Sequence, residues 1–201
     1  PRSERLRGAL AMNTSRLNSF TDGVIAIIIT IMVLALPVPQ GAGMAALKPL
    51  SVLFAAYALS FVKVGVYWSQ HHHMLQASKR VDGKVLIANL FFLFWVSLVP
   101  FVMRWVGEAG VTRDTVLAFG VIMLLCASSI ALLFFALISA NDADAPITKA
   151  SKRGHKGQIT ILAYILAIAV AFLWPYVAVL IYIAVAAMWL VPDKRFEKLI
   201  D

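Results

Sequence analysis

Charged side chains are scarce in this chain. Of its 201 residues only 14% are Asp, Glu, Lys or Arg, whereas 61% are hydrophobic. A soluble domain usually carries about 25% charged residues. The shortage of charge therefore excludes an ordinary soluble domain and indicates a polytopic membrane protein, whose surroundings are a lipid bilayer.

Cysteine and histidine are also rare. The single thiol, Cys126, can build neither a disulfide framework nor a thiolate metal cage within one chain. Three of the four histidines are consecutive, His71 to His73. Because consecutive helical residues point about 100° apart, these three cannot chelate one ion from a regular helix. No H-E-x-x-H, glycine-rich phosphate loop or G-x-S-x-G motif is present, so we predict no metal site, no cofactor and no enzyme.

Long apolar runs, by contrast, are abundant. A helix that spans a bilayer needs about 20 mostly apolar residues, and six segments come close. We predict an all-α fold with a single six-helix transmembrane domain over residues 1–201, with helices at about 16–37, 47–76, 84–106, 114–140, 157–173 and 175–191. The last two segments also fit one long kinked helix, because about 32 continuous residues extend roughly 48 Å.

The basic residues decide between these two topologies. Cytoplasmic loops of membrane proteins are enriched in Lys and Arg. With six spans and both termini inside, the cytoplasmic segments contain Arg2, Arg5, Arg7, Arg16, Lys79, Arg80, Lys84, Lys149, Lys152, Arg153, Lys156, Lys194, Arg195 and Lys198. Only Lys48, Arg104 and Arg113 then lie outside. We therefore predict a multi-pass protein of the cell membrane with both termini cytoplasmic, and the net charge of +8 needs no nucleic acid partner.

The first apolar run contains a carboxylate near its start, in RLNSFTDGVIAIIIT at residues 16–30. At about 100° per residue one stripe of this helix collects Arg16, Phe20, Gly23, Ile27, Thr30, Ile31 and Leu34. Asp22 lies well off that stripe, so we expect the carboxylate to face other helices of its own bundle. An Ile and Leu stripe by itself is typical of lipid contact or ordinary packing.

Asp22 is costly within a membrane unless it is paired or hydrated, and such groups usually mark function or a structural ion pair. Lys63 and His71 on the second predicted helix reach the same depth. Two interpretations stay open, a polar staple between the helices or a proton relay. The relay predicts an alternative function, a small secondary transporter or proton-coupled carrier that uses Asp22, Lys63 and His71. Transporters tend to have broken helices and internal repeats, which the first helix lacks.

Three segments carry a family resemblance. Arg16, Phe20, Thr21 and Asp22 resemble the R-x-x-x-F-S-D signature on the first helix of the transmembrane protein 175 family of potassium channels. YWSQHH (67–72) is similar to the end of that family's second helix, and NLFFLFWVSLVPF (89–101) to its third. Thr21 departs from the usual serine, since it keeps the hydroxyl and adds a methyl group.

The resemblance implies a homotetramer whose first helices line a central pore. It places the narrowest point at Ile27, further apolar rings at Ile31 and Leu34, and a hydroxyl position at Thr30. It also implies a signature polar network, built by Arg16, Asp22, Trp68 and His71 beside Phe20 and Thr21, that holds the pore helix.

The implied activity is passive flux of monovalent cations. No TVGYG-like segment exists in the chain, so a filter of backbone carbonyls is excluded within it. We therefore expect a hydrophobic constriction of Ile and Leu side chains, with the permeant potassium ion passing near Ile27 and Thr30 and a modest preference for potassium over sodium.

Overall fold

The computed structural model describes residues 14–41, 43–151 and 155–190. Over these ranges the chain is helical and contains no strand, which confirms the all-α class. The elements are α2 (Thr14–Leu34), the 3₁₀ helix η1 (Met44–Leu50), α3 (Ser51–Gln76), α4 (Gly83–Ser97), α5 (Val99–Ala109), α6 (Arg113–Ala140), α7 (Pro146–Ser151), α8 (Lys156–Ala171) and α9 (Pro175–Leu190).

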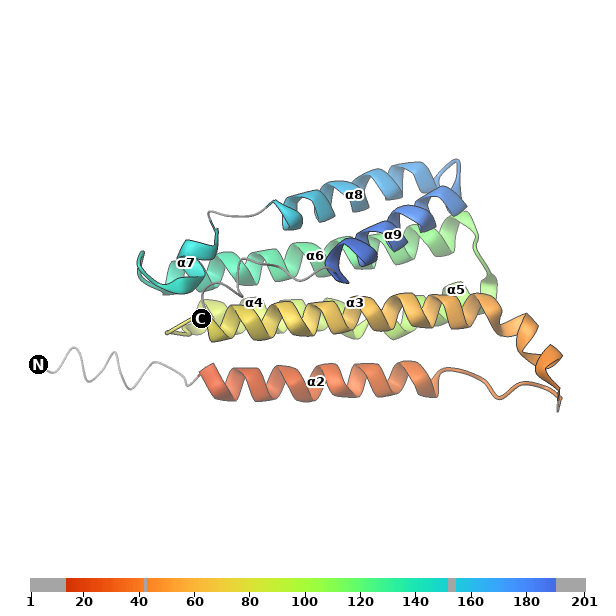
Figure 1. The fold of residues 1–201 in the computed structure, drawn as a ribbon, viewed down its shortest axis with the longest axis horizontal. Helices are drawn as coiled ribbons and strands as arrows, with labels where there is room; N and C mark the ends of the chain where they lie inside the picture. The colour runs from red at the N-terminus through yellow and green to blue at the C-terminus, as the bar shows by residue number, and fades with distance from the viewer. Residues whose placement is uncertain (1–13, 42, 152–154, 191–201) are drawn as a thin grey trace, which may run out of the picture.

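The helices run up and down in one bundle, with α2 along one edge and α8 along the opposite edge (Figure 1). The α3–α4 turn and α7 lie at the same end, and η1 and the α5–α6 turn lie at the other (Figure 1). At the first of these ends, the backbone N–H of Ile147 donates to the carbonyl of Ala77 at 3.1 Å. The side chain of Asn141 also accepts from the backbone N–H of Lys79 at 2.8 Å. These bonds fix the segment after α6 to the turn after α3.

Local signals start two of the long helices. The carboxylate of Asp82 accepts from the backbone N–H of Val85 at 3.0 Å and caps α4. Thr112 and Thr115 form a reciprocal capping box at the start of α6. Each cap satisfies backbone donors that have no partner inside the helix.

The segment predicted as one helix over 84–106 is two helices. A turn at Leu98 separates α4 from α5. Pro100 follows two residues later, and because proline has no N–H, the carbonyl of Val96 loses its usual helical donor there. The predicted helix over 84–106 therefore corresponds to one apolar stretch, Gly83–Ala109, which is divided at Leu98.

Four stretches are long and apolar enough to cross a membrane: Thr14–Leu34, Met44–Gln76, Gly83–Ala109 and Arg113–Ala140. The helices α8 and α9 are shorter, 16 residues each, and pack beside each other as separate helices rather than one fused rod. That all six helical stretches cross the bilayer stays a prediction. The predicted cytoplasmic position of both termini concerns residues outside the described ranges.

Most helices bury a broad face, but α2 buries only one narrow side. Its buried residues are Leu17, Thr21, Ile25, Ile28 and Met32. The core elsewhere is formed by large side chains from several helices, including Phe92, Met123, Tyr164 and Tyr182. The first helix is therefore attached at the side of the bundle, and within the part of the chain that the structure describes about half of its residues are exposed.

Candidate functional site

Two adjacent polar residues hold α2 in place. The side-chain amide of Asn89 on α4 donates to the hydroxyl of Thr21 at 3.0 Å. The ring nitrogen of Trp68 on α3 donates to Oδ1 of Asp22 at 2.8 Å. Because consecutive helical residues point about 100° apart, these bonds tie α2 to two different neighbours. Together they fix the rotation of α2 about its own axis.

A third bond connects α3 with α4. Nε2 of His71 lies 3.0 Å from Oδ1 of Asn89, and its ring stacks on Phe92 with centroids 6.2 Å apart. Asn89 thus bonds to α2 and α3 at once, and it is fully buried. Thr21, His71 and Asn89 form a closed polar contact among three helices.

Of the predicted partners of Asp22, the structure joins Trp68 to it and leaves Lys63 and His71 without a bond to it. Its carboxylate accepts from Trp68 and, at 2.7 Å, from the amide of Asn18, and the described residues show no bond from it to Lys63 or His71. The ammonium of Lys63 instead lies 5.5 Å from the ring centroid of Tyr164 on α8. The side chain of Lys63 points into the bundle, so the predicted relay of Asp22, Lys63 and His71 is not assembled.

Other residues of the predicted network lie apart from it. Arg16 is exposed at the start of α2, and Phe20 is exposed one turn later. Asn18 and Asn89 were missed as network residues. Asn89 had a visible signal, because it is the single amide in the apolar run from Val85 to Val96, and amides in membrane helices usually bond across helices.

The outward face of α2, which we define as Phe20, Ile27, Thr30, Ile31 and Leu34, lies opposite these bonds. Ile27, Ile31 and Leu34 are 58%, 46% and 82% exposed. The hydroxyl of Thr30 donates to the carbonyl of Ile27 at 2.8 Å, which leaves its oxygen able to accept. The site is therefore an apolar face that carries one available hydroxyl oxygen.

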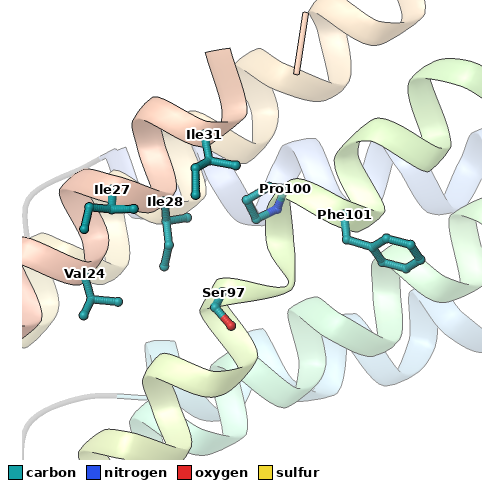
Figure 2. A pocket seen from close by; sticks show the side chains of 7 residues that line it. All are labelled: Val24, Ile27, Ile28, Ile31, Ser97, Pro100 and Phe101. Carbon is teal, nitrogen blue, oxygen red and sulfur yellow. The ribbon is translucent and has the colours of Figure 1, made fainter. Parts of the chain in front are cut away.

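An open apolar pocket of about 440 Å³ adjoins this face. Figure 2 shows its lining: Val24, Ile27, Ile28 and Ile31 of α2, with Ser97, Pro100 and Phe101 from the α4–α5 junction. The break at Leu98 thus leaves open space directly beside Ile27 and Ile31.

The described residues contain no group of three or more His, Cys, Asp or Glu side chains that could hold a metal ion. His71 bonds to Asn89, and His72 stacks on Trp68 with centroids 5.9 Å apart. The chemistry available at the outward face of α2 is therefore that of hydrocarbon and hydroxyl groups.

Comparison with known proteins identifies the family. Residues 16–100 match the family model described as the endosomal/lysosomal potassium channel TMEM175. A potassium channel of Chryseobacterium sp. (strain P1-3) is 42% identical over 187 residues, which cover 93% of this chain and 97% of that protein. The chain belongs to the TMEM175 family. This family consists of potassium channels, which are membrane proteins that conduct ions and are not enzymes.

Two further proteins agree with this assignment. A potassium channel of Streptomyces collinus is 36% identical over 102 residues, about half of each chain. The crystal structure of a lysosomal potassium-selective channel TMEM175 homolog from Chamaesiphon minutus superposes with a TM-score of 0.78 at 24% identity. It covers 89% of this chain and 96% of that one. This last likeness shows that the TMEM175 fold extends over nearly the whole subunit.

Proposed function

We propose that four copies of this chain surround a potassium-permeable pore lined by the outward face of α2. The observation that carries the proposal is the large exposure of Ile27, Ile31 and Leu34 on a helix whose rotation is fixed from the opposite side. Because this face lies on the outside of the bundle, several copies are needed to enclose a path along it. The number four follows from the family resemblance.

The proposed constriction works by excluding water. Four isoleucine side chains that meet on an axis form a narrow apolar ring, and such rings block ions by dewetting. A small rotation of the α2 helices widens the ring and admits hydrated potassium. Flux is passive, because no coupled relay is assembled at Asp22, Lys63 and His71.

Selectivity in this account is modest. The hydroxyls of Thr30 lie one turn from Ile27 and donate to its carbonyl, so that in the proposed pore their oxygens accept toward the axis. They replace part of the hydration shell of a cation, but they form fewer and less rigid contacts than a carbonyl filter. A modest preference for potassium over sodium follows.

The experiment is a flux assay on Ile27→Asn. Purified protein in liposomes with a potassium gradient should leak potassium faster when Ile27 is replaced by Asn, because an amide ring stays wet. The matched control is Val33→Asn on the same helix, where Val33 is 48% exposed but lies about 120° around from Ile27. The control should behave as the unmodified protein does. Equal flux from Ile27→Asn and from the unmodified protein contradicts a constriction at Ile27.

A further inference from the structure

Among the described residues, several buried polar atoms have no hydrogen-bond partner, and three of them belong to α3 and α8: Nζ of Lys63, Oγ of Ser60 and Oη of Tyr164. Lys63 is 1% exposed, and the other two side chains are fully buried. Ser60 lies one turn before Lys63 on α3, on the same side of the helix. Tyr164 reaches them from α8, with its ring centroid 5.5 Å from Nζ of Lys63.

Apart from the thiol of Cys126, a weak acceptor that interacts with Lys63, and the hydroxyl of Tyr67, which interacts with that of Tyr164, this cluster contains donors without an acceptor. A lysine ammonium has three N–H donors and cannot accept, and each hydroxyl has one further donor. The rings of Tyr67 and Tyr164 lie 5.0 and 5.5 Å from Nζ and attract the cation through their faces. Aromatic faces, however, neither neutralise the charge nor satisfy all three donors.

No carboxylate of the described residues supplies the missing charge. Lys63 forms no ion pair there. Asp22 is the candidate counterion at the most similar depth, but its carboxylate accepts hydrogen bonds from Trp68 and Asn18. A charge buried in a membrane bundle is costly unless an opposite charge or water accompanies it. The site therefore lacks an anion.

We infer that a halide ion, chloride in the cell, binds inside each subunit between α3 and α8. It accepts from the ammonium of Lys63 and from the hydroxyls of Ser60 and Tyr164. Water supplies an acceptor but no charge, so it compensates the site only in part. A monatomic ion suits the cluster better than an oxyanion, because all three side chains are enclosed by packed helices.

The site is separate from the outward face of α2. Lys63 points toward Tyr164 of α8, whereas the proposed pore lies on the outer side of α2. The halide joins two helices within one subunit, and its effect is on the stability of that subunit. The inference does not rest on the pore proposal.

The test is the thermal unfolding midpoint of the purified full-length protein in detergent. Potassium chloride, bromide and gluconate are compared at equal ionic strength, since gluconate is too large to enter. The midpoint should be higher in both halides, by about 5 °C once the halide is in hundredfold excess over its dissociation constant. In Lys63→Met this difference should vanish. In Lys84→Met, which changes an exposed lysine, it should persist.

Two results overturn the inference. One is an unmodified protein with the same midpoint in all three salts. The other is a Lys63→Met variant that keeps the halide difference. If Lys63→Met does not fold, the variants Tyr164→Phe and Ser60→Ala test the site instead. Each removes one donor to the halide, so each should raise the halide concentration at which the unfolding midpoint increases. Unchanged dependence in both variants overturns the site. The assay involves no flux, so its failure and that of the proposed pore are distinguishable.

Discussion

Thr21 and Asp22 are neighbours in sequence, yet each bonds to a different helix. Thr21 contacts Asn89 on α4, and Asp22 contacts Trp68 on α3. Both bonds point away from the outward face of α2. The carboxylate at the mouth of the apolar run is thus a positioning group, because its bond to Trp68 sets which residues α2 presents to its surroundings.

Replacing Trp68 by Phe tests this role. The variant keeps an aromatic ring but removes the N–H that donates to Asp22, and a hydrogen bond to a charged group contributes about 1.5 kcal/mol or more to the free energy of unfolding. The midpoint of thermal unfolding should fall by about 3–6 °C. The matched control is Trp105→Phe, since Trp105 is exposed to a similar degree, 40% against 43%, and packs on Phe101 instead. Equal midpoints for the two variants contradict the positioning role.

The sequence predicts the direction of Asp22 better than its partners. Helical periodicity alone shows that Asp22 points away from Ile27, and the structure agrees. Trp68 was predicted beside Asp22 only through the family resemblance. The rotation of α3 against α2, which selects Trp68 rather than Lys63, does not follow from the residues of one sequence. The positive charge of Lys63 suggested that it pairs with Asp22, but its side chain points toward the rings of Tyr67 and Tyr164.

At the scale of elements, close helix packing depends on small residues. A Cβ added at Gly120 of α6 would collide with Oη of Tyr182 and with Ile168. Tyr182 itself donates to the carbonyl of Val116 at 3.1 Å. Gly120 therefore lets α6 pack against both α8 and α9.

Gly120→Ala should destabilise the protein. The added methyl group forces Tyr182 and Ile168 to move, and overpacking of this kind costs about 1–3 kcal/mol. Gly65→Ala on α3 is the control, because a Cβ there meets nothing within 4 Å, and alanine favours the helix by up to about 1 kcal/mol. Thermal unfolding of both variants measures the difference. A Gly120→Ala variant as stable as Gly65→Ala contradicts the close contact.

The boundary of a helix could be predicted from the sequence only where more than one local signal marked it. The separation of α8 from α9 was predictable, because Pro175 and the distribution of basic residues both favoured it. The break between α4 and α5 was missed, although Pro100 was visible in the sequence. A proline inside a membrane helix is often tolerated, so the residue alone does not determine whether the helix divides.

For the molecule as a whole, charge placement predicts orientation. Arg80 lies in the α3–α4 turn and Arg113 at the start of α6, at opposite ends of the bundle (Figure 1). The end with Arg80 also carries Lys79, Lys84 and Lys149, and we propose that it faces the cytoplasm of a cell membrane.

Thiol labelling measures this orientation. Single cysteines at Arg80 and Arg113, in a Cys126→Ser background, form a matched pair because both arginine side chains are 61% exposed. In intact cells a membrane-impermeant maleimide should label Arg113→Cys and spare Arg80→Cys. Opening the membrane should make both react. Labelling of Arg80→Cys alone in intact cells contradicts the proposed orientation.

Assembly is the property that a single sequence predicts least directly. The fold of one subunit follows from apolar runs and their caps, but the outward face of α2 is equally compatible with lipid on periodicity alone. Family membership shows a potassium channel, and the fixed rotation of α2 supports our proposal that its outward face lines the pore.

The most direct measurement is cation flux through Ile27→Cys, Cys126→Ser protein in liposomes, before and after a small cationic methanethiosulfonate reagent is added. Thiols react as thiolates and so need water. A pore at Ile27 predicts that the reagent blocks potassium flux in this variant, while Val33→Cys in the same background keeps its flux. Flux that is unchanged in Ile27→Cys, or lost equally in both variants, contradicts a pore lined by the outward face of α2.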